Sequence, residues 1–95
     1  MWKIEKILLK DMESVVSDFE KFINADYFSK LGKQQQEIIT LKKEVMDINI
    51  KIFNAYILER GEVGENEYCD LLESTFEARK YLTDYQRKLL EEGDA

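Results

Sequence analysis

Carboxylates are the residues whose spacing could do chemistry in this chain, and they gather between positions 59 and 77. Seven acidic side chains lie in this stretch, where Arg60 is the one basic residue. Carboxylate oxygens are the ligands that hard divalent cations such as Ca²⁺ and Mg²⁺ prefer. The spacing does not match an EF-hand loop, however, and no residue stands where that loop needs its first aspartate. The sequence therefore predicts no metal site.

Catalysis is not expected either, because the residues that usually carry it are missing. The chain has no histidine, which removes the commonest general base and the commonest metal ligand. The spacing of Glu67 and Asp70 occurs in helical nucleotide pyrophosphohydrolases, but these also need a glutamate-rich motif on a preceding helix, and Glu37 and Glu44 are too far apart to form one. No glycine-rich phosphate loop is present, and no nucleophile stands beside a base. We therefore expect a protein with no catalytic residues and no cofactor.

Charge and length exclude further classes. The 95 residues allow one domain, spanning 1–95, and the net charge is −6. Such an acidic chain lacks the basic surface that phosphate contacts require, so direct binding of nucleic acid is not expected. No apolar run approaches the roughly 20 residues of a membrane span. Cys69 is the single cysteine, which favours a reducing compartment and a cytoplasmic location, and we expect it to be partly buried.

Hydrophobic spacing predicts three helices, at about 2–23, 26–60 and 66–92. The chain has no proline to interrupt them. Steps of three and four residues define one apolar face of the first helix, comprising Ile4, Leu8, Met12, Val15, Phe19 and Phe22. Gly61 is placed to end the second helix, and Gly32 could break it near its start. Trp2, at the end of the chain, could cover the bundle or contact a partner.

Short connections between helices favour antiparallel neighbours. The expected fold class is therefore all-α, as an antiparallel three-helix bundle. The alternative is a long helical hairpin with an extra N-terminal helix.

The second helix carries two apolar rows. One has the heptad spacing of a coiled coil and comprises Leu31, Ile38, Leu41, Val45, Ile48, Ile52 and Ala55. The other lies about 100° to 140° away around the helix and comprises Ile39, Met46, Ile50, Phe53 and Ile57. Because one neighbouring helix cannot easily cover both rows, we expect the second row to form an oligomer interface, most simply of a homodimer. The alternative is that a third helix of the same chain covers it.

The start of the third helix carries an acidic stripe, defined as Glu62, Glu65, Glu67, Asp70, Glu73 and Glu77. Like charges at helical spacing repel by a few tenths of a kcal/mol per pair, so the stripe does not favour folding. It is a candidate surface for a basic protein partner. The alternative is a solvated helix start that keeps the protein soluble.

These features together favour a small non-enzymatic regulator or adaptor that acts by protein–protein interaction and self-associates. A second hypothesis is an inhibitor of the type that phages and mobile elements encode. Residues 59–77 of such an inhibitor would block a basic, nucleic-acid-binding groove of its target. A third is a secretion-type chaperone that holds an amphipathic helix of its client.

Overall fold

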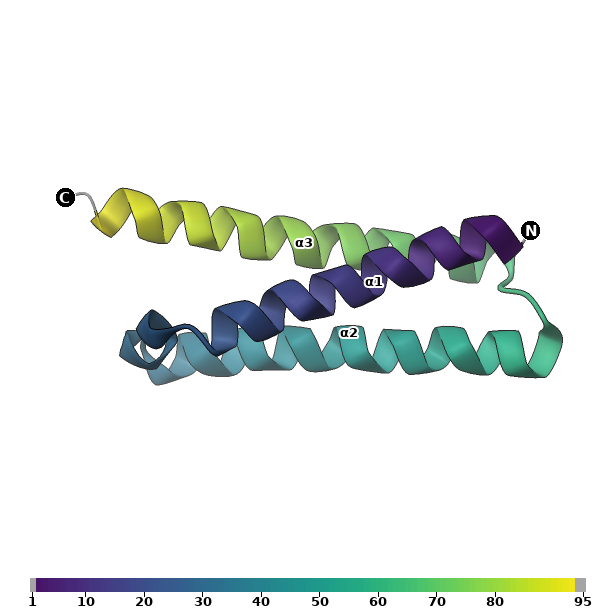
Figure 1. Cartoon of the computed structure of the whole chain (residues 1–95), viewed down its shortest axis with the longest axis horizontal. Helices are drawn as coiled ribbons and strands as arrows, with labels where there is room; N and C mark the ends of the chain where they lie inside the picture. The colour runs from purple at the N-terminus through teal and green to yellow at the C-terminus, as the bar shows by residue number, and fades with distance from the viewer. Residues whose placement is uncertain (1, 94–95) are drawn as a thin grey trace.

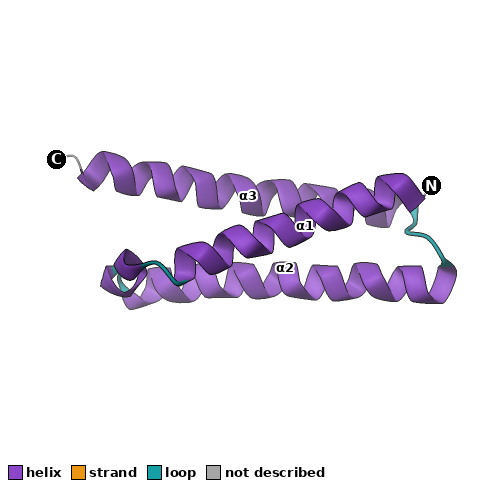
Figure 2. Ribbon diagram, in the orientation of Figure 1, coloured by secondary structure: helices purple, strands orange, loops and turns teal. Residues whose placement is uncertain are grey.

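The computed structural model describes residues 2–93, with side chains for residues 4–92, so the side chain of Trp2 lies outside the described residues. Three α-helices and one short 3₁₀ helix make up nearly all of this part of the chain, which contains no strand (Figure 2). They are α1 (Trp2–Ile23), the 3₁₀ helix η1 (Asp26–Lys30), α2 (Lys33–Arg60) and α3 (Glu65–Gly93). The prediction of an all-α three-helix bundle is confirmed.

The helices lie along one long axis, and the described residues extend over 51 × 20 × 18 Å. α2 runs opposite to both α1 and α3, and α1 lies in front of them in this view, crossing diagonally from α3 towards α2 (Figure 1). α1 packs against both other helices, and it packs more extensively against α2 than against α3. Each helix of the bundle therefore contributes to one shared core.

α1 supplies most of that core because its apolar face meets two helices at once. Leu8, Met12, Val15, Phe19 and Phe22 are buried, as the spacing predicts. Ile4, the first residue of the same face, remains 57% exposed. Residues of the α2–α3 loop, such as Val63 and Gly64, lie beside it and leave it partly open.

The second predicted helix is shorter than expected. Residues 26–30 form η1, and α2 begins at Lys33 rather than at residue 26. Leu31 and Gly32 have extended backbone, with ψ angles of 157° and 148°, which interrupts the helical path. The side-chain amide of Gln36 donates a hydrogen bond of 2.8 Å to the Leu31 carbonyl and so satisfies an acceptor that the break leaves free.

Gly61 ends α2 as expected. Its φ of +77° is the left-handed conformation that glycine adopts without steric cost, and its N–H donates to the Ile57 carbonyl at 2.8 Å. α3 begins at Glu65, one residue earlier than predicted. The carbonyl of Gly64 accepts a hydrogen bond from the Tyr68 N–H, so Gly64 precedes the first turn.

Candidate interaction surface

A row of apolar side chains lies on the outside of α2. Ile38, Leu41, Val45, Ile48 and Ile52 are between 37% and 53% exposed, and Ala55 continues the row. We call these six residues the α2 seam. Their steps of three and four residues give the spacing by which one helix packs against another in a coiled coil. A regular apolar row of this length at the surface is the feature of the bundle most suited to binding another helix.

The structure reverses the expected roles of the two rows of this helix. The row expected to form an oligomer interface lies inside the chain: Ile39, Met46 and Phe53 are at most 1% exposed, and Ile50 and Ile57 are half-buried. The physical reason is that α1 and α3 together cover this face, which was the alternative left open by the sequence. These five side chains are therefore not available at the surface, whereas the heptad row is.

α3 lies along one edge of the α2 seam. The Asn49 amide donates a hydrogen bond of 2.9 Å to the Ser74 hydroxyl. One heptad earlier, the Lys42 ammonium lies 4.4 Å from the centre of the Tyr81 ring. The two residue numbers add to 123 in both contacts. The contacts therefore fix the register of the antiparallel pair: a residue of α2 is level with a residue of α3, at the same height along the bundle, when their numbers add to 123.

The acidic stripe borders the α2 seam along this same edge. Val45 of the seam and Glu77 of the stripe line one small groove between α2 and α3, with a volume of about 220 Å³. Five members of the stripe are exposed, namely Glu62, Glu65, Asp70, Glu73 and Glu77. No ion pair joins any of these five to another side chain in the described part of the chain. Their charges are therefore free to act on a partner.

Glu67, the sixth member of the stripe, is used inside the chain. Its two carboxylate oxygens accept hydrogen bonds of 2.8 and 2.9 Å from the Arg60 guanidinium, which also lies over the Tyr56 ring. Tyr56 and the backbone of Gly64 provide further hydrogen bonds to the carboxylate. The Arg60 hydrogen bonds in particular lower the pKa of Glu67. Glu67 therefore joins the end of α2 to the start of α3.

Glu5 is a structural residue that the sequence did not single out. It is 5% exposed, and its carboxylate accepts a hydrogen bond of 2.7 Å from the Val63 N–H. This contact ties the start of α1 to the loop between α2 and α3, 58 positions later. The signal that could have found it is its position on the apolar face of α1, three residues before Leu8.

Cys69, which was expected to be partly buried, and Phe76 both lie at the surface of α3. Cys69 is exposed, and Phe76 is 65% exposed. They are seven residues apart on α3 and so share one helical face. That face turns away from the buried row of Leu71, Thr75 and Leu82, which packs in the core.

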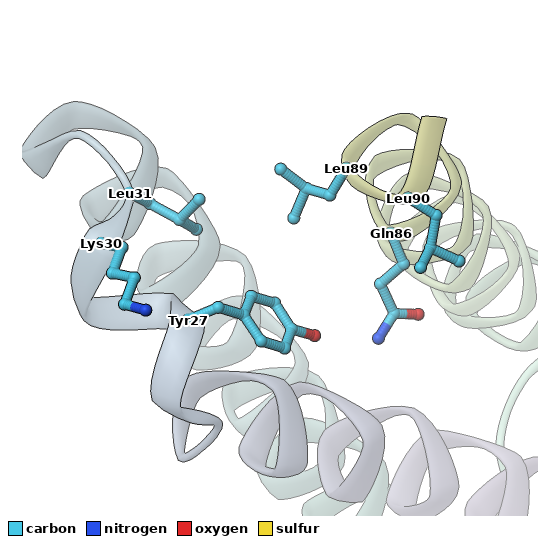
Figure 3. A pocket seen from close by; sticks show the side chains of 6 residues that line it. All are labelled: Tyr27, Lys30, Leu31, Gln86, Leu89 and Leu90. Carbon is cyan, nitrogen blue, oxygen red and sulfur yellow. The ribbon is translucent and has the colours of Figure 1, made fainter. Parts of the chain in front are cut away.

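A cavity of about 500 Å³ opens at the end of the bundle where η1 faces the last turns of α3 (Figure 3). Leu31, Leu89 and Leu90 give it mostly apolar walls, and Lys30 is its one charged lining residue. The Tyr27 ring and the Gln86 side chain extend into the gap from opposite sides. The cavity lies at the opposite end of α3 from the acidic stripe.

Comparison with protein-family models, with curated proteins and with solved structures finds no match to this chain. Within the described residues, no helix is both long enough and apolar enough to span a bilayer. The same residues contain no group of three or more histidine, cysteine, aspartate or glutamate side chains placed to hold a metal ion. The interpretation of function therefore depends on the geometry of the surface.

Proposed function

We propose that this protein is a non-enzymatic regulator or adaptor that binds another protein through the α2 seam. The exposure of a complete heptad row carries the proposal. Ile38, Leu41, Val45, Ile48 and Ile52 could all have been polar without loss to the core, because α1 and α3 already cover the opposite face of α2. Exposed apolar rows of this kind typically serve an interface.

The expected mode of binding is helix against helix. Apolar side chains at positions a and d of a heptad insert between four residues of a facing helix. The six seam residues span about 25 Å of helix at a rise of about 1.5 Å per residue. A partner helix of five turns would cover them.

The proposal is tested by comparing the proteins retained by immobilised wild-type chain and by a Leu41→Asn variant, using extract of the native host. Leu41 is 49% exposed, so the variant keeps the core and should keep its helical circular dichroism. Leu90→Asn is the matched control, because Leu90 is 72% exposed but lies on α3, outside the seam. We expect Leu41→Asn to lose the proteins that wild type and control retain. Identical retention by all three chains would reject the seam as the binding surface.

The acidic stripe supports a second candidate function, an inhibitor that occupies a basic groove. The supporting observation is that Asp70, Glu73 and Glu77 are exposed and make no ion pair within the described residues. Replacing these three by lysine should abolish capture of a basic, nucleic-acid-binding target and leave helicity unchanged. Undiminished capture would exclude this function. Glu67 is left intact in this test because it holds α2 and α3 together.

A further inference from the structure

We propose that the protein bound by the α2 seam is a second copy of this chain, packed in parallel so that each α3 lies beside the partner's α2. This proposal rests on the proposed function in using the same surface, and it adds the identity and orientation of the occupant. Three observations carry it: the residue types along the seam, the position of α3 beside it, and the charges on either side.

The residue types of the seam suit a parallel pair of helices. In heptad notation Ile38, Val45 and Ile52 occupy position a, and Leu41, Ile48 and Ala55 occupy position d. All three a residues are β-branched. β-branched residues at a favour two parallel strands when leucine stands at d, and Leu41 is the one leucine among the three d residues. No polar residue interrupts the six layers.

α3 occupies one flank of the seam and leaves the other flank open. Position e holds Lys42 and Asn49, and both contact α3 through Tyr81 and Ser74. Position g, on the opposite flank, holds Glu37, Glu44 and Lys51, and all three are exposed. In a parallel pair, the g side of one helix faces the e side of the other. The partner's g residues would therefore meet the outer edge of α3.

The charges on these two surfaces run in opposite order. Along α2, position g changes from acidic at Glu37 and Glu44 to basic at Lys51. Along α3, the outer edge begins with the acidic residues Asp70, Glu73 and Glu77. Nearer its end it carries Lys80, Arg87 and Lys88, together with Asp84, which forms ion pairs with Lys80 and Arg87. Because α2 and α3 are antiparallel, the acidic part of position g on α2 and the acidic part of the outer edge of α3 lie at opposite ends of one protomer. A parallel copy therefore brings unlike charges together.

The register of α2 and α3 makes this pairing specific. Level residues on the two helices add to 123, as the Asn49–Ser74 contact shows. Position 51 is thus level with position 72, so the partner's Lys51 lies between Asp70 and Glu73. Position 37 is level with position 86, which places the partner's Glu37 beside Arg87 and Lys88. Lys51, Asp70 and Glu73 have no ion pair of their own within the described residues, so all three are available.

An antiparallel pair would bring different residues together. It would place both α3 helices on the same side of the seam, because e faces e and g faces g in that orientation. With position 38 facing position 55, level residues of the two α3 helices would have numbers that add to about 153, so Glu73 would lie beside the partner's Lys80 and Glu77 beside the partner's Glu77. The pairing of Lys51 with Asp70 and Glu73 therefore belongs to the parallel orientation, because in the antiparallel one position g lies on the flank away from α3.

Charge reversal across the interface tests the pairing. In sedimentation equilibrium, Lys51→Glu should raise the dimer dissociation constant by about tenfold or more, because two attractive contacts per dimer become repulsive. The double variant Asp70→Lys, Glu73→Lys should do the same. Combining all three substitutions in one chain should restore the wild-type constant. A combined variant as weak as either parent would overturn the pairing.

Disulfide trapping tests the orientation. An Ile38→Cys variant in a Cys69→Ser background should form a covalent dimer under mild oxidation, since position 38 faces its own copy in a parallel pair. In an antiparallel pair, position 38 would face position 55, about 25 Å along the helix, and no covalent dimer would form. A wild-type chain that stays monomeric to about 100 μM would overturn the second copy as occupant. The proposal that this protein binds another protein through the α2 seam has its own test, and it fails if Leu41→Asn retains the same proteins as wild type.

Discussion

Ile38 and Ile39 are adjacent, identical in type and opposite in burial, which makes them a sharp test of the fold. Ile39 is completely buried in the core, whereas Ile38 is 42% exposed on the α2 seam. Replacing either by alanine changes helix propensity by the same amount. Any difference between the two variants therefore reports how much packing each side chain contributes.

The expected difference is large. Truncating a buried isoleucine to alanine costs about 2–5 kcal/mol, because the transfer free energy is lost and a cavity remains. A chain of this length has a total stability of about 5–14 kcal/mol, so Ile39→Ala should lose a substantial part of it. Ile38→Ala should cost about 1 kcal/mol or less, since much of that side chain already contacts water.

Urea unfolding followed by circular dichroism measures the two costs. At a slope of about 1–3 kcal/mol per molar urea, the midpoint of Ile39→Ala should fall by on the order of 1–3 M. The urea midpoint of Ile38→Ala should fall by less than about half of the decrease for Ile39→Ala. The measurement is made at low micromolar concentration, so that loss of a dimer does not contribute. Equal costs, or a greater cost at Ile38, would refute the assignment of the two rows.

Three further predictions concern the residues that hold the helices in place. Glu5→Ala should cost about 1–3 kcal/mol in thermal or urea unfolding, because the partly buried Val63 N–H loses its acceptor; a neutral result would show that this contact does not stabilise the fold. Gly61→Ala should destabilise by about 1–2 kcal/mol because its φ is +77°. Gly32→Ala, at the N-cap of α2, has no atom within 4 Å of the added Cβ and an ordinary φ, so it should cost less than Gly61→Ala; equal effects would contradict the cap assignment. The stability that Glu67 contributes through its lowered pKa should be fully present at neutral pH and lost as the pH falls below about 4.3. Wild type and Glu67→Gln should accordingly converge in urea midpoint as the pH falls through the lowered pKa of Glu67, and a gap that stays constant with pH would count against the ion pair.

The periodicity of the sequence was sufficient to predict the helices, because α1, α2 and α3 each carry apolar residues at helical spacing. It was not sufficient to say which row of α2 faces inward. A heptad row is usually the buried one, yet here Ile39, Met46 and Phe53 are buried instead. The distinguishing signal is that Ile50 and Ile57 widen this second row into a face that two helices can cover.

The remaining errors have similar causes. Glu67 counted as one of six equivalent carboxylates, because a stripe on a helix gives no information about residues of the preceding helix. Only the packed structure brings Arg60 and Tyr56 to it and makes it structural. Glu5 was missed because its partner, the Val63 N–H, is a backbone group distant in sequence. Long-range contacts of this kind have no local pattern.

Sedimentation velocity of the wild-type chain over a range from about 1 to 100 μM measures whether two copies associate. The chain should pass from monomer to dimer within this range. Ile48→Asn, at a seam position that is 53% exposed, should remain monomeric with unchanged helicity, while the control Leu90→Asn should dimerise like wild type. Dimerisation that survives Ile48→Asn, or a wild-type chain that remains monomeric throughout, would contradict the assignment of the α2 seam as the surface where two copies meet.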